Sequence, residues 1–185
     1  TGKLEEAEQW YWRSLTLAEK INDRARFSWF YVEIALVQKD LGKLQEARKN
    51  IVRAIKSGRD IKSSRCIHYA LVVLGDLRIV EAQEKLSAGQ ISIPIYKQLL
   101  HRAKATLQHV ISLEGLEAEP TIESKYLLAM VFTLLDESEQ AKQLASTTLK
   151  EAEENEIIRN GARIHRLLGL IAKQQGDFEQ ADREF

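Results

Sequence analysis

Proline and cysteine are scarce in this sequence of 185 residues, which has two prolines and one cysteine. Because proline disrupts helix interiors, its scarcity beside abundant Ala, Leu, Glu, Lys, Gln and Arg favours helices over strands. The single cysteine, Cys66, excludes an intrachain disulfide and is typical of a reducing compartment. We therefore expect an all-α, cytoplasmic protein.

An excess of charge is also missing, since 27 Lys and Arg residues balance 27 Asp and Glu residues. Without a net field, the chain has no general attraction for nucleic acid or anionic lipid. No apolar run approaches the roughly 18 to 20 residues of a membrane span. We expect no nucleic acid partner through this chain and no membrane contact.

Motifs that carry chemistry are missing as well. The spacing of a phosphate-binding loop does not occur, and the four histidines, His68, His101, His109 and His165, include no i, i+4 pair. Runs of glutamate such as the one at 151–156 are typical of a solvated helix face. The sequence therefore predicts no catalytic residue, no metal site and no cofactor.

What the sequence does contain is an internal repeat. Gly2-Lys3-Leu4-Glu5-Glu6-Ala7 returns as Gly42-Lys43-Leu44-Gln45-Glu46-Ala47, and Asp136-Glu137-Ser138-Glu139-Gln140-Ala141 returns as Gly176-Asp177-Phe178-Glu179-Gln180-Ala181. The period is the same in both cases, from Ala7 to Ala47 and from Ala141 to Ala181. Glycine ends helices in the left-handed conformation, and alanine lets two helices approach closely. Each copy therefore predicts a helix hairpin.

One repeat is longer than the others. The copy at Leu99-Leu100-His101-Arg102-Ala103 follows Ala47 by more than one period and less than two, and the excess falls at about 83–98. The segment begins as a continued helix and ends as a loop near Pro94. Two readings stay open: an inert long helix with a surface loop, or a projection that touches a partner.

The last copy has Leu168-Gly169 in one helix and Gly176-Asp177-Phe178-Glu179-Gln180-Ala181 at the start of the next. It resembles the tetratricopeptide repeat. The 40-residue period exceeds the usual period of about 34, and such long units are similar to those of MalT-like and STAND-type bacterial regulators. The resemblance implies a right-handed α-solenoid of antiparallel helix pairs, a superhelix that binds proteins on its concave face.

The period divides the chain into units of one repeat domain over residues 1–185, which we expect to be a fragment of a longer protein. The expected units are 1–23 with one helix, 24–60, 61–118 with the insertion, 119–155, and an incomplete unit at 156–185. The expected helices cover about 3–21, 24–41, 44–58, 61–87, 96–115, 120–135, 137–154, 156–175 and a start at 178.

The family alignment implies which residues line the concave face. They are Val32, Leu36, Lys39, Val72, Asp76, Tyr126, Met130, Thr133, Arg163, Arg166, Leu170 and Lys173. This face is apolar in its middle and basic at one end, so an amphipathic helix with an acidic flank would suit it. The lysine and asparagine pattern that holds a peptide carboxyl terminus in some family members is missing.

A second candidate surface lies near the start of the chain, where seven aromatic residues fall between positions 10 and 31. Consecutive aromatics at 10–12 cannot all face one core. Trp10, Trp12 and Trp29 therefore form a candidate end interface, toward missing parent sequence or an external partner.

These observations favour a non-catalytic scaffold for protein–protein interaction, the sensor or recruitment module of a larger protein in signal transduction or transcription regulation. Its partner would be a protein or peptide. The alternative is a structural spacer or self-association element with a filled groove, assembling through its exposed repeat ends.

Overall fold

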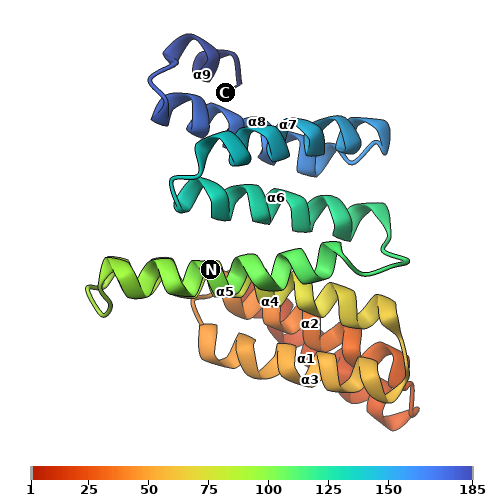
Figure 1. The fold of residues 1–185 in the computed structure, drawn as a ribbon. Coiled ribbons are helices and arrows are strands. Elements are labelled where there is room, and N and C mark those ends of the chain that lie inside the picture. The colour runs from red at the N-terminus through yellow and green to blue at the C-terminus, as the bar shows by residue number, and fades with distance from the viewer. Residues whose placement is uncertain (1, 185) are drawn as a thin grey trace. The chain divides into compact units, whose positions relative to one another are not determined.

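The computed structural model describes residues 2–184, which form nine α-helices and no strand (Figure 1). The outermost residues of the first and last expected units, Thr1 and Phe185, lie outside the described residues. The helices are α1 (Gly2–Lys20), α2 (Arg24–Asp40), α3 (Leu44–Asp60), α4 (Ser64–Ser87), α5 (Ile93–Ile111), α6 (Ala118–Leu134), α7 (Ser138–Glu154), α8 (Ile158–Gln174) and α9 (Phe178–Glu184). The all-α prediction is confirmed, and the helices repeat along the chain.

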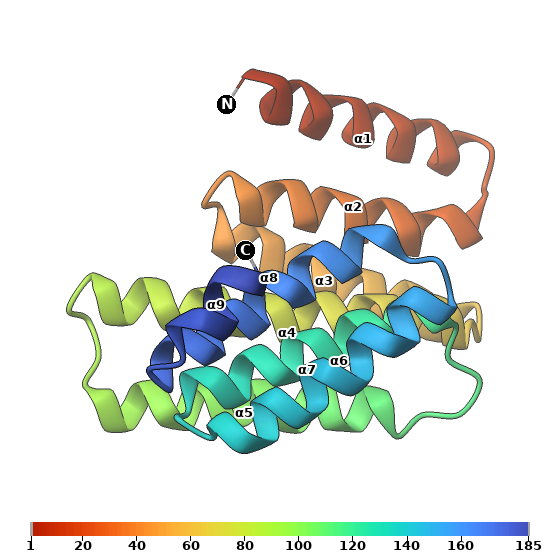
Figure 2. The same cartoon turned by 90° about the horizontal axis from the view of Figure 1, so that it is seen from above.

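The chain falls into two compact units, unit 1 up to Glu81 and unit 2 from Ala82 onward. In unit 1, α1 contacts α2 and α2 contacts α3; Figure 2 shows α1 running alongside α2 from the turn that joins them. In unit 2, α6 contacts α5, α7 and α8, and α8 contacts α9. Figure 1 shows α6 between α5 and the α7–α8 pair.

A common turn ends most of these helices. After α7, Glu156 takes a φ of 58°, its N–H donates to the Glu153 carbonyl at 3.1 Å, and the Ile157 N–H donates to the Ala152 carbonyl at 2.8 Å. This pair of bonds is a Schellman motif, which satisfies carbonyls that the helix end leaves open. The same left-handed position recurs at a constant spacing, at Asn22, Gly42 and Lys62 and again at Asp136, Glu156 and Gly176.

Small residues bring the helices of unit 1 together. Ala35, Ala47 and Ala54 are fully buried and pack with Ile51 and Leu77 in one apolar cluster. Alanine at these positions lets helix backbones approach closely, while the larger side chains fill the space beside them. Ala47, which the repeat predicts to lie at a close helix contact, is fully buried in this cluster.

Unit 2 uses the same arrangement. Ala129, Ala141 and Ala145 are fully buried and pack with Ile164 and Ile171. This core fixes α6 against α7 and α8, and thereby sets which faces of α6 and α8 stay uncovered.

The insertion is more helical than its sequence suggests. The structure has α4 running to Ser87 and α5 starting at Ile93, three residues before the predicted start at 96. Pro94 lies in the first turn of α5, where a proline costs the helix no hydrogen bond. Over the part of the chain described, no helix is both long and apolar enough to cross a membrane.

Candidate partner-binding cavity

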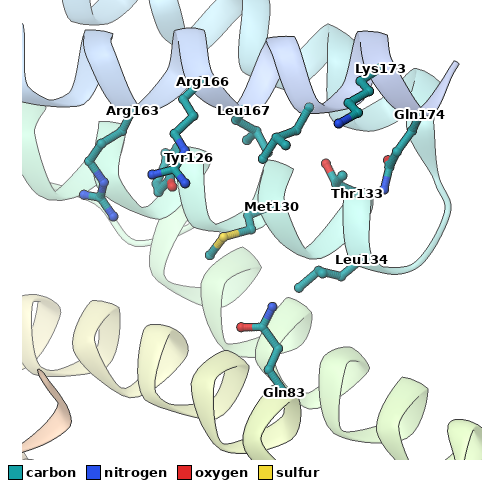
Figure 3. Close-up of a pocket in the computed structure, with 11 residues that line it drawn as sticks. Gln83, Tyr126, Met130, Thr133, Leu134, Arg163, Arg166, Leu167, Lys173 and Gln174 are labelled. Atoms are coloured by element: carbon teal, nitrogen blue, oxygen red, sulfur yellow. The ribbon is translucent and has the colours of Figure 1, made fainter. Parts of the chain in front are cut away.

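A cavity of about 770 Å³ opens in unit 2 between α6 and α8, with one residue from the end of α4 (Figure 3). A cavity of this size lies in the range of ligand-binding pockets. Its lining residues are Gln83, Tyr126, Met130, Thr133, Leu134, Arg163, Arg166, Leu167, Leu170, Lys173 and Gln174.

Helix periodicity explains why these residues share one cavity. On α6, Tyr126, Met130, Thr133 and Leu134 follow steps of three and four residues, which keep side chains on one face of a helix. The lining residues of α8 follow the same steps from position 163 to position 174. The core of unit 2 adjoins this lining, because Leu167 belongs to the core cluster and Tyr126 and Met130 pack against it.

The cavity presents apolar surface that the fold does not cover. Leu170 is 43% exposed and lines the cavity together with Met130 and Leu134. Met130 and Leu134 project from α6 toward the cavity in Figure 3 and are only partly buried. This uncovered apolar surface is suited to apolar side chains of a ligand.

One cation of the cavity is already paired. The Arg163 Nη1 lies 2.6 Å from Glu123 Oε2, and the guanidinium carbon lies 4.3 Å from the centroid of the Tyr126 ring. Burial alone would lower the pKa of Arg163, but the charge and hydrogen bond of Glu123, with a smaller contribution from Tyr126, leave that pKa raised. The positive charge of Arg163 is therefore balanced within unit 2.

The other two cations differ from Arg163. Arg166 and Lys173 are exposed, and neither side chain forms an ion pair or hydrogen bond with any residue between 2 and 184. No lining residue that the structure describes is acidic. The charge left open in the cavity is therefore positive.

The predicted concave-face residues divide between the two units. The structure brings seven of them together in this cavity: Tyr126, Met130, Thr133, Arg163, Arg166, Leu170 and Lys173. The Thr133 hydroxyl is already used, since it donates to the Ala129 carbonyl at 3.0 Å.

The predicted residues of unit 1 offer much less surface. Val32 and Val72 are only 2% and 4% exposed, and Leu36 packs against the core cluster. Lys39 forms an ion pair with Asp76, and both side chains are largely buried. For Val32 and Val72 the expectation of a partner-facing side chain is corrected, because their helical positions point into the core.

Four lining residues were absent from the predicted set. Leu134, Leu167 and Gln174 lie four residues after Met130, Arg163 and Leu170, so the helical period could have identified them. Gln83 comes from the helical extension in the insertion, where no repeat copy marks its position.

At the predicted end interface, the three tryptophans have different surroundings. Trp10 is 57% exposed, with the Arg13 guanidinium 4.9 Å from its ring centroid. Trp12 is partly buried, and Trp29 makes an edge contact with Tyr69 at a centroid distance of 5.3 Å. Of the three tryptophans, Trp10 therefore exposes the largest fraction of its side chain to solvent.

No protein-family model and no curated protein matches this chain. Among solved structures, the fold is similar to that of BtubC (BKLC) from P. vanneervenii, with a TM-score of 0.70. The match covers 98% of this chain and 70% of that chain at 16% sequence identity. At this identity the likeness shows the fold alone, a helical repeat.

Proposed function

We propose that this chain is a non-catalytic scaffold of the tetratricopeptide type, a right-handed solenoid of antiparallel helix pairs that binds a peptide segment of another protein in the cavity of unit 2. The constant spacing of the left-handed turns supports the repeat assignment. Within a larger regulatory protein, such binding would sense or recruit the partner.

The observation that carries this proposal is the composition of the cavity. Leu170 and Met130 supply uncovered apolar surface, and Arg166 and Lys173 supply unpaired charge at positions fixed by one helix. Grooves that bind peptides combine apolar pockets with a few fixed polar groups in this way.

A peptide selection tests the proposal. A displayed library of random 15-residue peptides would be selected on the wild-type chain, and the enriched peptides measured by fluorescence anisotropy. Leu170→Trp places a bulky ring in the cavity, and Ile158→Trp is the matched control, because Ile158 is 85% exposed on the same helix and does not line the cavity.

We expect the selected peptides to lose at least about tenfold in affinity on Leu170→Trp and to keep their affinity on Ile158→Trp. Circular dichroism checks that both variants retain their helices. Equal binding by both variants, or no enrichment at all, refutes the proposal.

A second role, that of spacer or self-association element, is favoured for unit 1. The predicted concave-face positions there are filled, and Lys39 and Asp76 neutralise each other. Apolar surface lies instead on α1, where Trp10 and Leu17, seven residues apart on one helix face, are both more than half exposed.

Sedimentation velocity tests this second role. Self-association that weakens on Trp10→Ser/Leu17→Ser supports it, and a concentration-independent monomer refutes it.

A further inference from the structure

We infer that the cavity of unit 2 selects an acidic peptide, and that Arg166 and Lys173 supply this selectivity while Arg163 does not. The inference rests on the proposed function and specifies its ligand. Three cations and no acid line the cavity, so a ligand with carboxylates would complement it and a basic ligand would be repelled.

The division of roles among the cations follows from their partners. Arg163 already holds Glu123 at 2.6 Å and 2.8 Å, so a ligand carboxylate would have to compete with an ion pair that folding has formed. Arg166 and Lys173 have no such competitor within the region described. A ligand carboxylate gains attraction from these two cations without breaking an existing bond.

The spacing of the two cations defines the ligand further. Arg166 and Lys173 are seven residues apart on α8, which places their backbones about 10 Å apart at 1.5 Å per residue. Figure 3 shows them near opposite ends of the lined stretch of α8, with Leu167 between them. Two ligand carboxylates at positions i and i+7 of a helix, or i and i+3 of a polyproline II segment, lie on one face of the ligand and span about the same distance.

The apolar surface between the two cations favours a peptide over other polyanions as the ligand. Leu170 and Met130 expose apolar surface in this stretch of the cavity, and they have no hydrogen-bonding groups for a sugar–phosphate backbone. Apolar side chains placed between two acids would cover them. We therefore assign the site to acidic peptides with an apolar centre and not to nucleic acid.

The same peptide selection tests this inference through the composition of the enriched pool and a pair of charge variants. Arg166→Glu/Lys173→Glu reverses both cavity cations. The matched control is Arg159→Glu/Lys150→Glu, which makes the same change in net charge at exposed positions outside the cavity lining. A single-stranded oligonucleotide of 15 thymidines serves as the competing polyanion.

We expect enriched peptides to carry net negative charge, with pairs of acids three or seven positions apart around apolar residues. Their affinity should fall at least about tenfold on Arg166→Glu/Lys173→Glu, and at most about twofold on the control, at physiological ionic strength. The oligonucleotide should not displace them.

Neutral or basic peptides in the enriched pool, or equal losses on both double variants, would overturn the inference while leaving peptide binding intact. Displacement by the oligonucleotide at similar concentrations would assign the site to polyanions in general and also overturn it. If no peptide is enriched, both the inference and the proposed function fail.

Discussion

The turn after α7 gives a quantitative test of how the repeat is built. Glu156 takes a φ of 58° at the position where two other turns of this kind, those at 42 and 176, have glycine. A residue with a side chain in this left-handed conformation costs about 1 to 2 kcal/mol, and its side chain makes no ion pair or hydrogen bond within the described chain. Glu156→Gly removes this cost without removing a contact.

The gain is smaller than the strain, because glycine also loses more backbone entropy on folding, about 0.5 to 1 kcal/mol. The net expectation is a stabilisation of about 0.5 to 1 kcal/mol, or about 1 to 4 °C in the thermal midpoint for a chain of this length. Thermal unfolding followed by circular dichroism measures it.

Two control variants isolate the effect of the turn. Lys150→Gly places glycine inside α7, where it should destabilise by about 1 kcal/mol. Gly176→Ala adds a methyl group that meets nothing within 4 Å, so any loss of stability reports the backbone at its φ of 79°. The reasoning is refuted if Glu156→Gly lowers the midpoint as Lys150→Gly does, or if Gly176→Ala leaves it unchanged.

Two further predictions follow from the polar contacts. Glu123 accepts from Arg163 and, at 2.8 Å, from the buried Asn160, so Glu123→Ala should destabilise by about 1 to 3 kcal/mol in urea unfolding. Glu123→Gln should lower the stability less than Glu123→Ala. It should also raise the affinity for acidic peptides, because it frees the charge of Arg163; unchanged affinity would show that Glu123 does not balance that charge. Glu8 bears on pH: burial raises its pKa, but bonds from Lys43 and Gln38 outweigh this and leave the pKa lowered. The Glu8 carboxylate therefore stabilises the fold above its ordinary pKa, and this contribution disappears as the pH falls through the lowered value. Between about pH 5 and pH 3 the wild type should lose more stability than Glu8→Gln; parallel losses would show that these bonds have no net effect.

The repeat could be predicted from the sequence because its signals are local. Gly42 and Gly176 mark two turns, and the alanines at 47, 141 and 181 mark close helix contacts, all of them buried in the structure. The turns at Lys62 and Glu156 lack glycine, so only the period located them. Pro94 suggested a loop, because the pattern alone does not separate a proline in a first helical turn from one in a loop.

The candidate site could be predicted only in part. The period identified the faces of α6 and α8, but the same alignment selected Val32 and Val72, which tertiary packing buries. The pairing of Arg163 with Glu123 joins residues 40 positions apart, and no local pattern shows which of the three cations stays open. These differences depend on packing between helices, which the alternation of residue types along one helix does not contain.

The chain's single methionine, Met130, lines the cavity and provides the most direct test of the central claim. The measurement is the ¹³C-methyl resonance of Met130, assigned with Met130→Leu, during titration with an acidic peptide from the selection. We predict that this resonance shifts and saturates with the dissociation constant measured by anisotropy, and that Arg166→Glu/Lys173→Glu abolishes the shift at the same peptide concentration. A peptide that binds while the Met130 resonance stays unchanged would show that the partner site lies elsewhere.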